Sequence, residues 1–156
     1  MNKRTILSLL GVSRERTAQI IREARDLMNA DGKHWIQGDE KQQLYDVLKD
    51  SYIPNEYAYC SVGAIKEVAK TEEEMIAAYY VLNKNGLGTW PEIDETFINE
   101  YENYLEDGCD PHNALYDVID NHKEYLEEEI INYNDADSTI WKNVKELFSR
   151  SAKALR

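Results

Sequence analysis

The sequence predicts an all-α protein that folds as a single compact domain of six or seven helices, residues 1–156. Apolar residues recur at the three-to-four-residue spacing of amphipathic helices through most of the 156 residues. Residues that typically start or stop helices separate these stretches, and no alternating run of five or more residues indicates a strand. The length is that of about one domain, and a hydrophobic content of 42% is sufficient for one core.

The first third of the chain is expected to contain two helices and a loop. Residues 17–28 carry an apolar stripe, with Ser13 as the expected N-cap and Asp31-Gly32 as the stop. Residues 40–49 have a weaker amphipathic pattern, which predicts a short helix. Residues 51–59 include a proline followed by an asparagine and are predicted to be a loop.

The rest of the chain is expected to be helical, with one main break at Gly86–Pro91. Four of the predicted helices begin at residues that can accept hydrogen bonds from free backbone N–H groups, namely those starting at Thr71, Asp94, Asp110 and Ser138. The predicted helices are 60–70, one from the capping box Thr71-Glu72-Glu73-Glu74 to about Leu82, one from Asp94 through Leu105, one from Asp110-Pro111 to Ile131, and one from Ser138 to about Leu155. Asn132–Asp135 is predicted to be a turn before the last helix.

Charge is distributed unevenly along the chain. The formal net charge is −12, yet residues 1–25 carry six basic and two acidic side chains, a local charge of +4. A strongly acidic body lacks the broad basic surface that binds nucleic acid through phosphates. The basic helical segment 1–25 either packs across acidic neighbours in the same chain or takes part in binding.

The composition also limits location and chemistry. No apolar run approaches the ~20 residues that span a bilayer, and the start of the chain does not match a secretory signal. Two cysteines, Cys60 and Cys109, give no disulfide framework. We therefore expect a cytoplasmic protein that contacts no membrane, with no metal site and no cofactor. His122 lies on an apolar stripe and is expected in the core.

Residues 6–20 resemble a helix-turn-helix of the sigma-factor type. The resemblance rests on the run Gly-Val-Ser-Arg-Glu-Arg at residues 11–16 and on Gln19-Ile20 after it. It implies that Arg14, Arg16 and Gln19 face a DNA major groove. This gives one alternative function, a DNA-binding regulator that uses residues 6–25. The other interpretation of the same residues is an ordinary capped amphipathic helix with a basic face.

Three further segments form a pattern: Gly32-Lys33-His34-Trp35-Ile36-Gln37-Gly38, Cys60-Ser61-Val62-Gly63-Ala64 and Tyr133-Asn134-Asp135. Together they resemble an uncharacterised family of small proteins from actinobacteria and bacteriophages. That family shows a Gly-Trp-x-x-Gly segment, a Cys-x-x-Gly-Ala helix start and a Trp-Asn-Asp turn. In this chain Tyr133 replaces the tryptophan, two residues separate Gly32 from the tryptophan, and residues 85–125 have no counterpart. The resemblance implies a shared ancestry without assigning a reaction. The motif positions of unknown role are Trp35, Gly38, Cys60, Gly63, Ala64, Asn134 and Asp135.

Cys60 is the only motif residue that could act as a nucleophile. A helix start can stabilise a thiolate, and His34 is the best available histidine partner for a cysteine hydrolase. No signature of a known cysteine enzyme surrounds Cys60, so we expect no catalytic residue. The structural alternative is a small buried residue that permits close packing beside Gly63 and Ala64. Asn134 and Asp135 are expected to shape a turn.

The tyrosines suggest an interaction surface. The chain has 11 tyrosines and two phenylalanines, and several tyrosines lie among acidic residues. Tyrosine is enriched at protein interfaces, and carboxylates beside it suit a basic partner. We therefore expect a small acidic interaction protein that binds a basic surface of a partner protein. A phage-encoded inhibitor of a host defence or nucleic-acid enzyme is one such protein. The expected contact residues are Tyr101, Tyr104, Glu106, Asp107, Glu124, Glu127 and Glu128.

Overall fold

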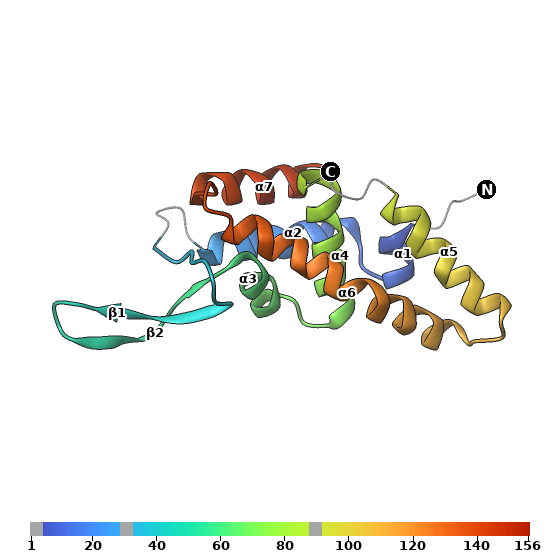
Figure 1. Cartoon of the computed structure of the whole chain (residues 1–156), viewed down its shortest axis with the longest axis horizontal. Helices are drawn as coiled ribbons and strands as arrows, with labels where there is room; N and C mark the ends of the chain where they lie inside the picture. Colours follow the sequence, from blue (N-terminus) through green and yellow to red (C-terminus); the bar gives the residue numbers. More distant parts are fainter. Residues whose placement is uncertain (1–4, 29–32, 88–91) are drawn as a thin grey trace.

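The computed structural model describes residues 5–28, 33–87 and 92–156, and these form an elongated, mostly helical molecule (Figure 1). A β-hairpin projects at one end, and the pair α5 and α6 extends to the other (Figure 1). The elements in order are α1 (Ile6–Leu10), α2 (Arg14–Met28), β1 (Lys41–Asp46), β2 (Ser51–Tyr59), α3 (Ser61–Val68), α4 (Glu72–Leu82), the π-helical turn η1 (Asn83–Leu87), α5 (Ile93–Glu106), α6 (Pro111–Asp135) and α7 (Trp141–Lys153).

Helix α2 lies at the centre of the helical body, where α3, α4 and α7 pack against it. Its apolar stripe is buried, and Ile20, Ile21 and Ala24 expose no surface. Thr17 is buried as well, and its hydroxyl donates to the carbonyl of Ser13 at 2.8 Å, so this polar side chain is satisfied. Burial of the stripe stabilises the helix more than intrinsic propensity does. Within the described ranges, no helix has the length and apolar character needed to cross a membrane.

Several predicted helix starts are confirmed by their cap hydrogen bonds. The Ser13 hydroxyl accepts from the backbone N–H of Arg16 at 3.0 Å. The Thr71 hydroxyl accepts from the Glu74 N–H at 3.2 Å, and the Asp110 carboxylate accepts from the Asn113 N–H at 3.1 Å. The stop predicted at Asp31-Gly32 lies outside the described residues.

The prediction of a purely α-helical fold is wrong at residues 41–59. The residues predicted as a short helix and a loop form β1 and β2, which pair as a two-stranded antiparallel sheet. Tyr45 and Tyr52 are cross-strand partners, with ring centroids 5.2 Å apart in an edge-to-face arrangement. Such aromatic pairs stabilise sheets across strands, which a periodicity search within one segment does not detect.

Pro54 made the second strand resemble a loop. The pairing register shifts between Gln43, opposite Tyr57, and Tyr45, opposite Tyr52, so β2 has extra residues at Pro54. Its neighbour Asn55 has a φ of 61°, in the left-handed region. Proline is tolerated in strands at open edges and bulges, and a two-stranded sheet has only edges.

Two boundaries near the C-terminus also differ from prediction. Asn132–Asp135 are not a turn but the last turn of α6, and α7 begins at Trp141 instead of Ser138. Asp94 lies in the first turn of α5 instead of capping it. The carboxylate of Asp94 is instead 2.5 Å from the ammonium of Lys84 and also accepts from the Tyr80 hydroxyl.

Candidate functional site

The motif residues singled out in the sequence meet around Asn134, whose side chain is fully buried near the end of α6. Its Oδ1 accepts hydrogen bonds from Trp35 Nε1 at 2.8 Å, from the Ser61 backbone N–H at 3.0 Å and from the Ser61 hydroxyl at 2.7 Å. Its Nδ2 donates to the carbonyl of Ile36 at 3.0 Å and to the carboxylate of Asp135 at 2.9 Å. One amide therefore joins three segments that are distant in sequence.

The segment around Gln37 and Gly38 covers the C-terminal end of α6. The Gln37 amide donates to the carbonyls of Asn134 at 2.9 Å and Ala136 at 3.1 Å. The backbone N–H of Gly38 donates to the Asp135 carboxylate at 3.0 Å. The two bonds from Gln37 occupy carbonyls at the helix end that have no partner inside the helix.

Cys60 is the N-cap of α3 and is only 5% exposed. Its Sγ accepts from the Gly63 backbone N–H at 3.4 Å. Burial raises the pKa of the Cys60 thiol, so the thiolate that a nucleophile requires is disfavoured. The backbone carbonyl of His34 accepts from the Tyr59 N–H at 2.7 Å, which places the histidine segment beside the strand that leads to Cys60.

Gly63 is needed because the backbone of Glu40 lies against it. A Cβ at position 63 would be 1.8 Å from the Glu40 carbonyl oxygen. The same oxygen accepts from the Cys60 N–H at 3.2 Å, and Ala64 in the next position exposes no surface. The small motif residues therefore permit a close approach between the chain before β1 and α3.

These contacts hold distant segments of the chain together, which is a structural role. Asn134 Oδ1 already accepts three hydrogen bonds, and Cys60 is a buried cap. Among the described residues, no group of three or more histidine, cysteine or acidic side chains could hold a metal ion. His122 is buried in α6, with Nε2 3.0 Å from the Glu100 carboxylate.

Arg14 and Arg16, two of the residues predicted to face a DNA groove, have partners within the molecule. The Arg14 guanidinium donates to the carbonyls of Leu155 at 3.2 Å and Ala154 at 3.3 Å. Arg16 forms a two-point ion pair with Glu74, at 2.8 and 3.1 Å.

The solvent-facing side of α2 is acidic overall. Gln19 is exposed and donates to Glu23 at 3.2 Å. The exposed charged residues after Gln19 in α2 are Arg22, Glu23 and Asp26. The side that would have to enter a DNA groove thus presents more negative than positive charge.

The strongest electrostatic feature is an acidic arm, which we define as residues 92–137 and which consists mainly of α5 and α6. It contains sixteen carboxylates and one lysine, a net charge of −15. The other residues of the chain therefore sum to +3. α5 and the N-terminal part of α6 extend from the helical body at the end opposite the β-hairpin, whereas the C-terminal part of α6 packs in the body against α3 and α4 (Figure 1).

The predicted contact residues divide into packed tyrosines and exposed carboxylates. Tyr101 was predicted to contact a partner, but it is only 8% exposed. It lies in the core of the arm, one turn after the buried Phe97. Tyr104 is half-buried, and its hydroxyl accepts from the Asn121 amide at 3.1 Å. Glu127, with a side chain 20% exposed, lies 3.3 Å from the Lys66 ammonium. The residues that are exposed are Glu106, Asp107, Glu124 and Glu128.

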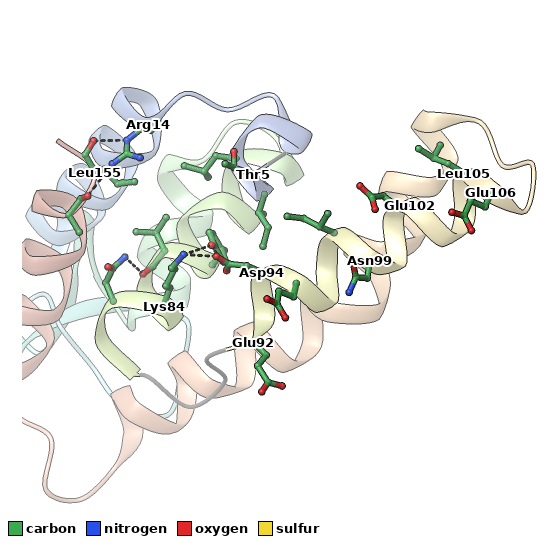
Figure 2. Close-up of a pocket in the computed structure, with 18 residues that line it drawn as sticks. Thr5, Arg14, Lys84, Glu92, Asp94, Asn99, Glu102, Leu105, Glu106 and Leu155 are labelled. Atoms are coloured by element: carbon green, nitrogen blue, oxygen red, sulfur yellow. Dashed lines mark hydrogen bonds and ion pairs between the residues drawn. The ribbon is translucent and has the colours of Figure 1, made fainter. Parts of the chain in front are cut away.

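A groove that the sequence patterns did not reveal runs along α5 (Figure 2). Its volume is about 1630 Å³, and α1, the end of α4 and the C-terminal residues form the opposite side. The face that α5 presents to it repeats every three or four residues, and this spacing was the available signal. The α5 residues of this face are Glu95, Ile98, Asn99, Glu102, Leu105 and Glu106.

The β-hairpin carries a second exposed feature. Val47 and Leu48 in the turn between its strands are 81% and 98% exposed. The weaker amphipathic pattern that predicted a helix at residues 40–49 gave no indication of this exposed turn.

Comparisons with known proteins give a family and no relative of known activity. No curated protein matches the chain, and no solved structure matches it. The sequence profile of a family of unknown function (DUF6197) matches residues 12–154, a span that includes the Asn134 contacts and the acidic arm. The chain therefore belongs to this family.

Proposed function

We propose that this protein is a small acidic interaction protein whose acidic arm docks on a basic surface of a partner protein. The observation that carries the proposal is the separation of charge, −15 on the arm against +3 on the rest of the chain. Charge gathered in one part of the molecule orients an approaching cationic surface and raises the association rate. An even distribution of the same net charge would promote solubility without selecting a docking face.

The packing of the arm supports a preformed surface. Phe97 and Tyr101 of α5 are buried, as are Val118 and Ile119 of α6. The carboxylates of α6 that face solvent recur every three or four residues and form one line, Asp117, Asp120, Glu124 and Glu128. A regular line of negative charge is also what a nucleic-acid-binding surface recognises in a phosphate backbone.

We further propose a basic nucleic-acid enzyme of a host cell as the partner class, with this protein acting in the host cytoplasm as a phage product. The support for this finer proposal is the line of carboxylates on α6 together with the resemblance of the three motif segments to proteins of actinobacteria and bacteriophages. An enzyme that binds phosphates carries the basic surface that the arm requires.

The test is affinity capture from a bacterial lysate with two variants of equal charge. The arm variant carries Glu106→Gln, Asp107→Asn, Glu124→Gln and Glu128→Gln. The matched control carries Glu15→Gln, Glu23→Gln, Glu56→Gln and Glu146→Gln, four exposed residues outside the arm. We expect the wild type and the control to capture basic proteins that the arm variant does not capture.

Binding kinetics of a captured protein then separate the arm from the overall charge. The arm variant should slow association about tenfold at low salt, since steering charges act mainly on the association rate. The control should change it by less than half as much. Equal slowing by both variants, or sequence-selective binding of duplex DNA by the wild type in a parallel anisotropy titration, would contradict the proposal.

A further inference from the structure

We propose that the groove between α1 and α5 is the docking site for a basic amphipathic helix of the partner, about four turns long. This inference rests on the proposed function, because it names the part of the acidic arm that makes the contact. It adds an apolar, shape-dependent component to an interaction that charge alone would leave unspecific.

The size of the groove fits a helix better than a small molecule. Small-molecule pockets usually measure about 300–1,000 Å³, whereas this groove measures about 1630 Å³ and follows α5 from Glu92 to Glu106 (Figure 2). A helix about 10 Å wide occupies roughly 120 Å³ per residue, so the groove corresponds to roughly 14 residues. The matching stretch of α5 is about 20 Å long at 1.5 Å per residue.

The chemistry of the α5 wall specifies an amphipathic occupant. Ile98 and Leu105 are half-buried and line the groove, and Leu155 lines it from the C-terminal end. Carboxylates at 92, 95, 102 and 106 are exposed along the same wall. A partner helix with an apolar stripe would bury these apolar side chains, and lysine or arginine at helical spacing beside the stripe would pair with the carboxylates.

Lys84 and Arg14, the basic residues among the described residues that line the groove, have partners at its inner end. The Lys84 ammonium is 2.5 Å from the carboxylate of Asp94, and Tyr80 donates to the same carboxylate. Arg14 donates to the carbonyls of Ala154 and Leu155. Figure 2 shows both sets of contacts on the side opposite the outer half of α5, where Glu102 and Glu106 lie. Glu106, which is exposed at the outer end of this wall, therefore lies away from the contacts of Lys84 and Arg14 and can pair with a cationic helix.

The test uses two labelled peptides of about 14 residues, both made of leucine and lysine in the same numbers. One has the helical period, with leucines on one face, and the other alternates leucine and lysine. Fluorescence anisotropy with the whole chain at low salt should show at least about tenfold tighter binding of the helical-period peptide, because only this peptide presents an apolar face when it is helical.

Two comparisons of double variants locate the contact, and within each comparison both variants have the same overall charge. Ile98→Asn with Leu105→Asn should weaken the helical peptide about tenfold, whereas Val47→Asn with Leu48→Asn on the β-hairpin should change it less than about twofold. Glu95→Gln with Glu102→Gln should weaken binding more than Asp120→Asn with Glu128→Gln on α6. Thermal unfolding of each variant confirms that it is folded.

The outcomes separate this inference from the proposed function. If both peptides bind equally and the Ile98 and Leu105 pair has no effect, the groove is not the site, while charge-dependent capture by the acidic arm still stands. If the hairpin pair abolishes binding, the apolar contact is the β-hairpin and the groove proposal is wrong. If neither peptide binds, the groove proposal also fails, and the capture experiment alone decides the proposed function.

Discussion

Gly63→Ala is the change for which helix propensity and the tertiary structure predict opposite signs. Replacing a helical glycine by alanine normally stabilises a protein by about 0.5–1 kcal/mol. Here the added Cβ would be 1.8 Å from the Glu40 carbonyl oxygen and 2.6 Å from its carbonyl carbon. Both are backbone atoms, so the overlap is relieved only if the chain before β1 moves away from α3.

The expected cost follows from this movement. Overpacking of a well-packed site costs about 1–3 kcal/mol, and the severity of the overlap places it at the upper end. Separation also breaks the hydrogen bond from the Cys60 N–H to the Glu40 carbonyl, 3.2 Å long, which contributes about 1 kcal/mol. After subtracting the gain in propensity, we expect a net loss of about 3 kcal/mol, or roughly 6–12 °C in Tm for a chain of this size.

The assay is thermal and urea unfolding followed by circular dichroism, with Gly108→Ala as the control. Gly108 has a φ of 93° and open space where its Cβ would lie, so its cost of about 1–2 kcal/mol comes from the backbone conformation alone. A Gly63→Ala variant with an unchanged or higher Tm would refute the close approach of Glu40 to α3. It would also refute the explanation of why this motif position is glycine.

Three other predictions test separate parts of the structure. Asn134→Ala leaves Trp35 Nε1 and the Ser61 groups without their acceptor, and we expect a loss of about 3 kcal/mol in urea unfolding; a loss below 1 kcal/mol would contradict the central role of this amide. The hydrogen bond from Arg16 lowers the pKa of the Glu74 carboxyl, so the stability from this pair is present above the unfolded pKa of about 4.3 and is lost as the pH falls through the lower folded value. Glu74→Gln should therefore cost about 1 kcal/mol at pH 7 and progressively less as the pH is lowered below the unfolded pKa, measured by denaturation over a series of pH values. Leu48→Ser should leave Tm within about 1 °C, because a side chain that is 98% exposed buries no apolar surface on folding; a larger fall would mean that the hairpin turn packs against something in solution.

Features set by neighbouring residues were predictable from the sequence. The caps at Ser13, Thr71 and Asp110 depend on a side chain and a backbone N–H three residues later, so the local sequence contains both partners. The apolar stripe of α2 has one helical period and does not depend on which helices cover it. The motif segments could be recognised by their residue types, although their contacts could not.

Only the tertiary structure decided how distant segments meet. Whether residues 41–59 pair as strands depends on cross-strand contacts such as Tyr45 with Tyr52, which no single amphipathic pattern contains. Trp35 and Asn134 are 99 residues apart in sequence, yet one hydrogen bond joins them. Tyr101 became a core residue because the face of α5 it occupies packs on α6, whereas its acidic neighbours in sequence suggested a surface. The negative charge of the chain was evident from composition, but its projection along a groove arises from the packing of α5 against α6 and α1, since side chains acquire a common face only when their helices are placed.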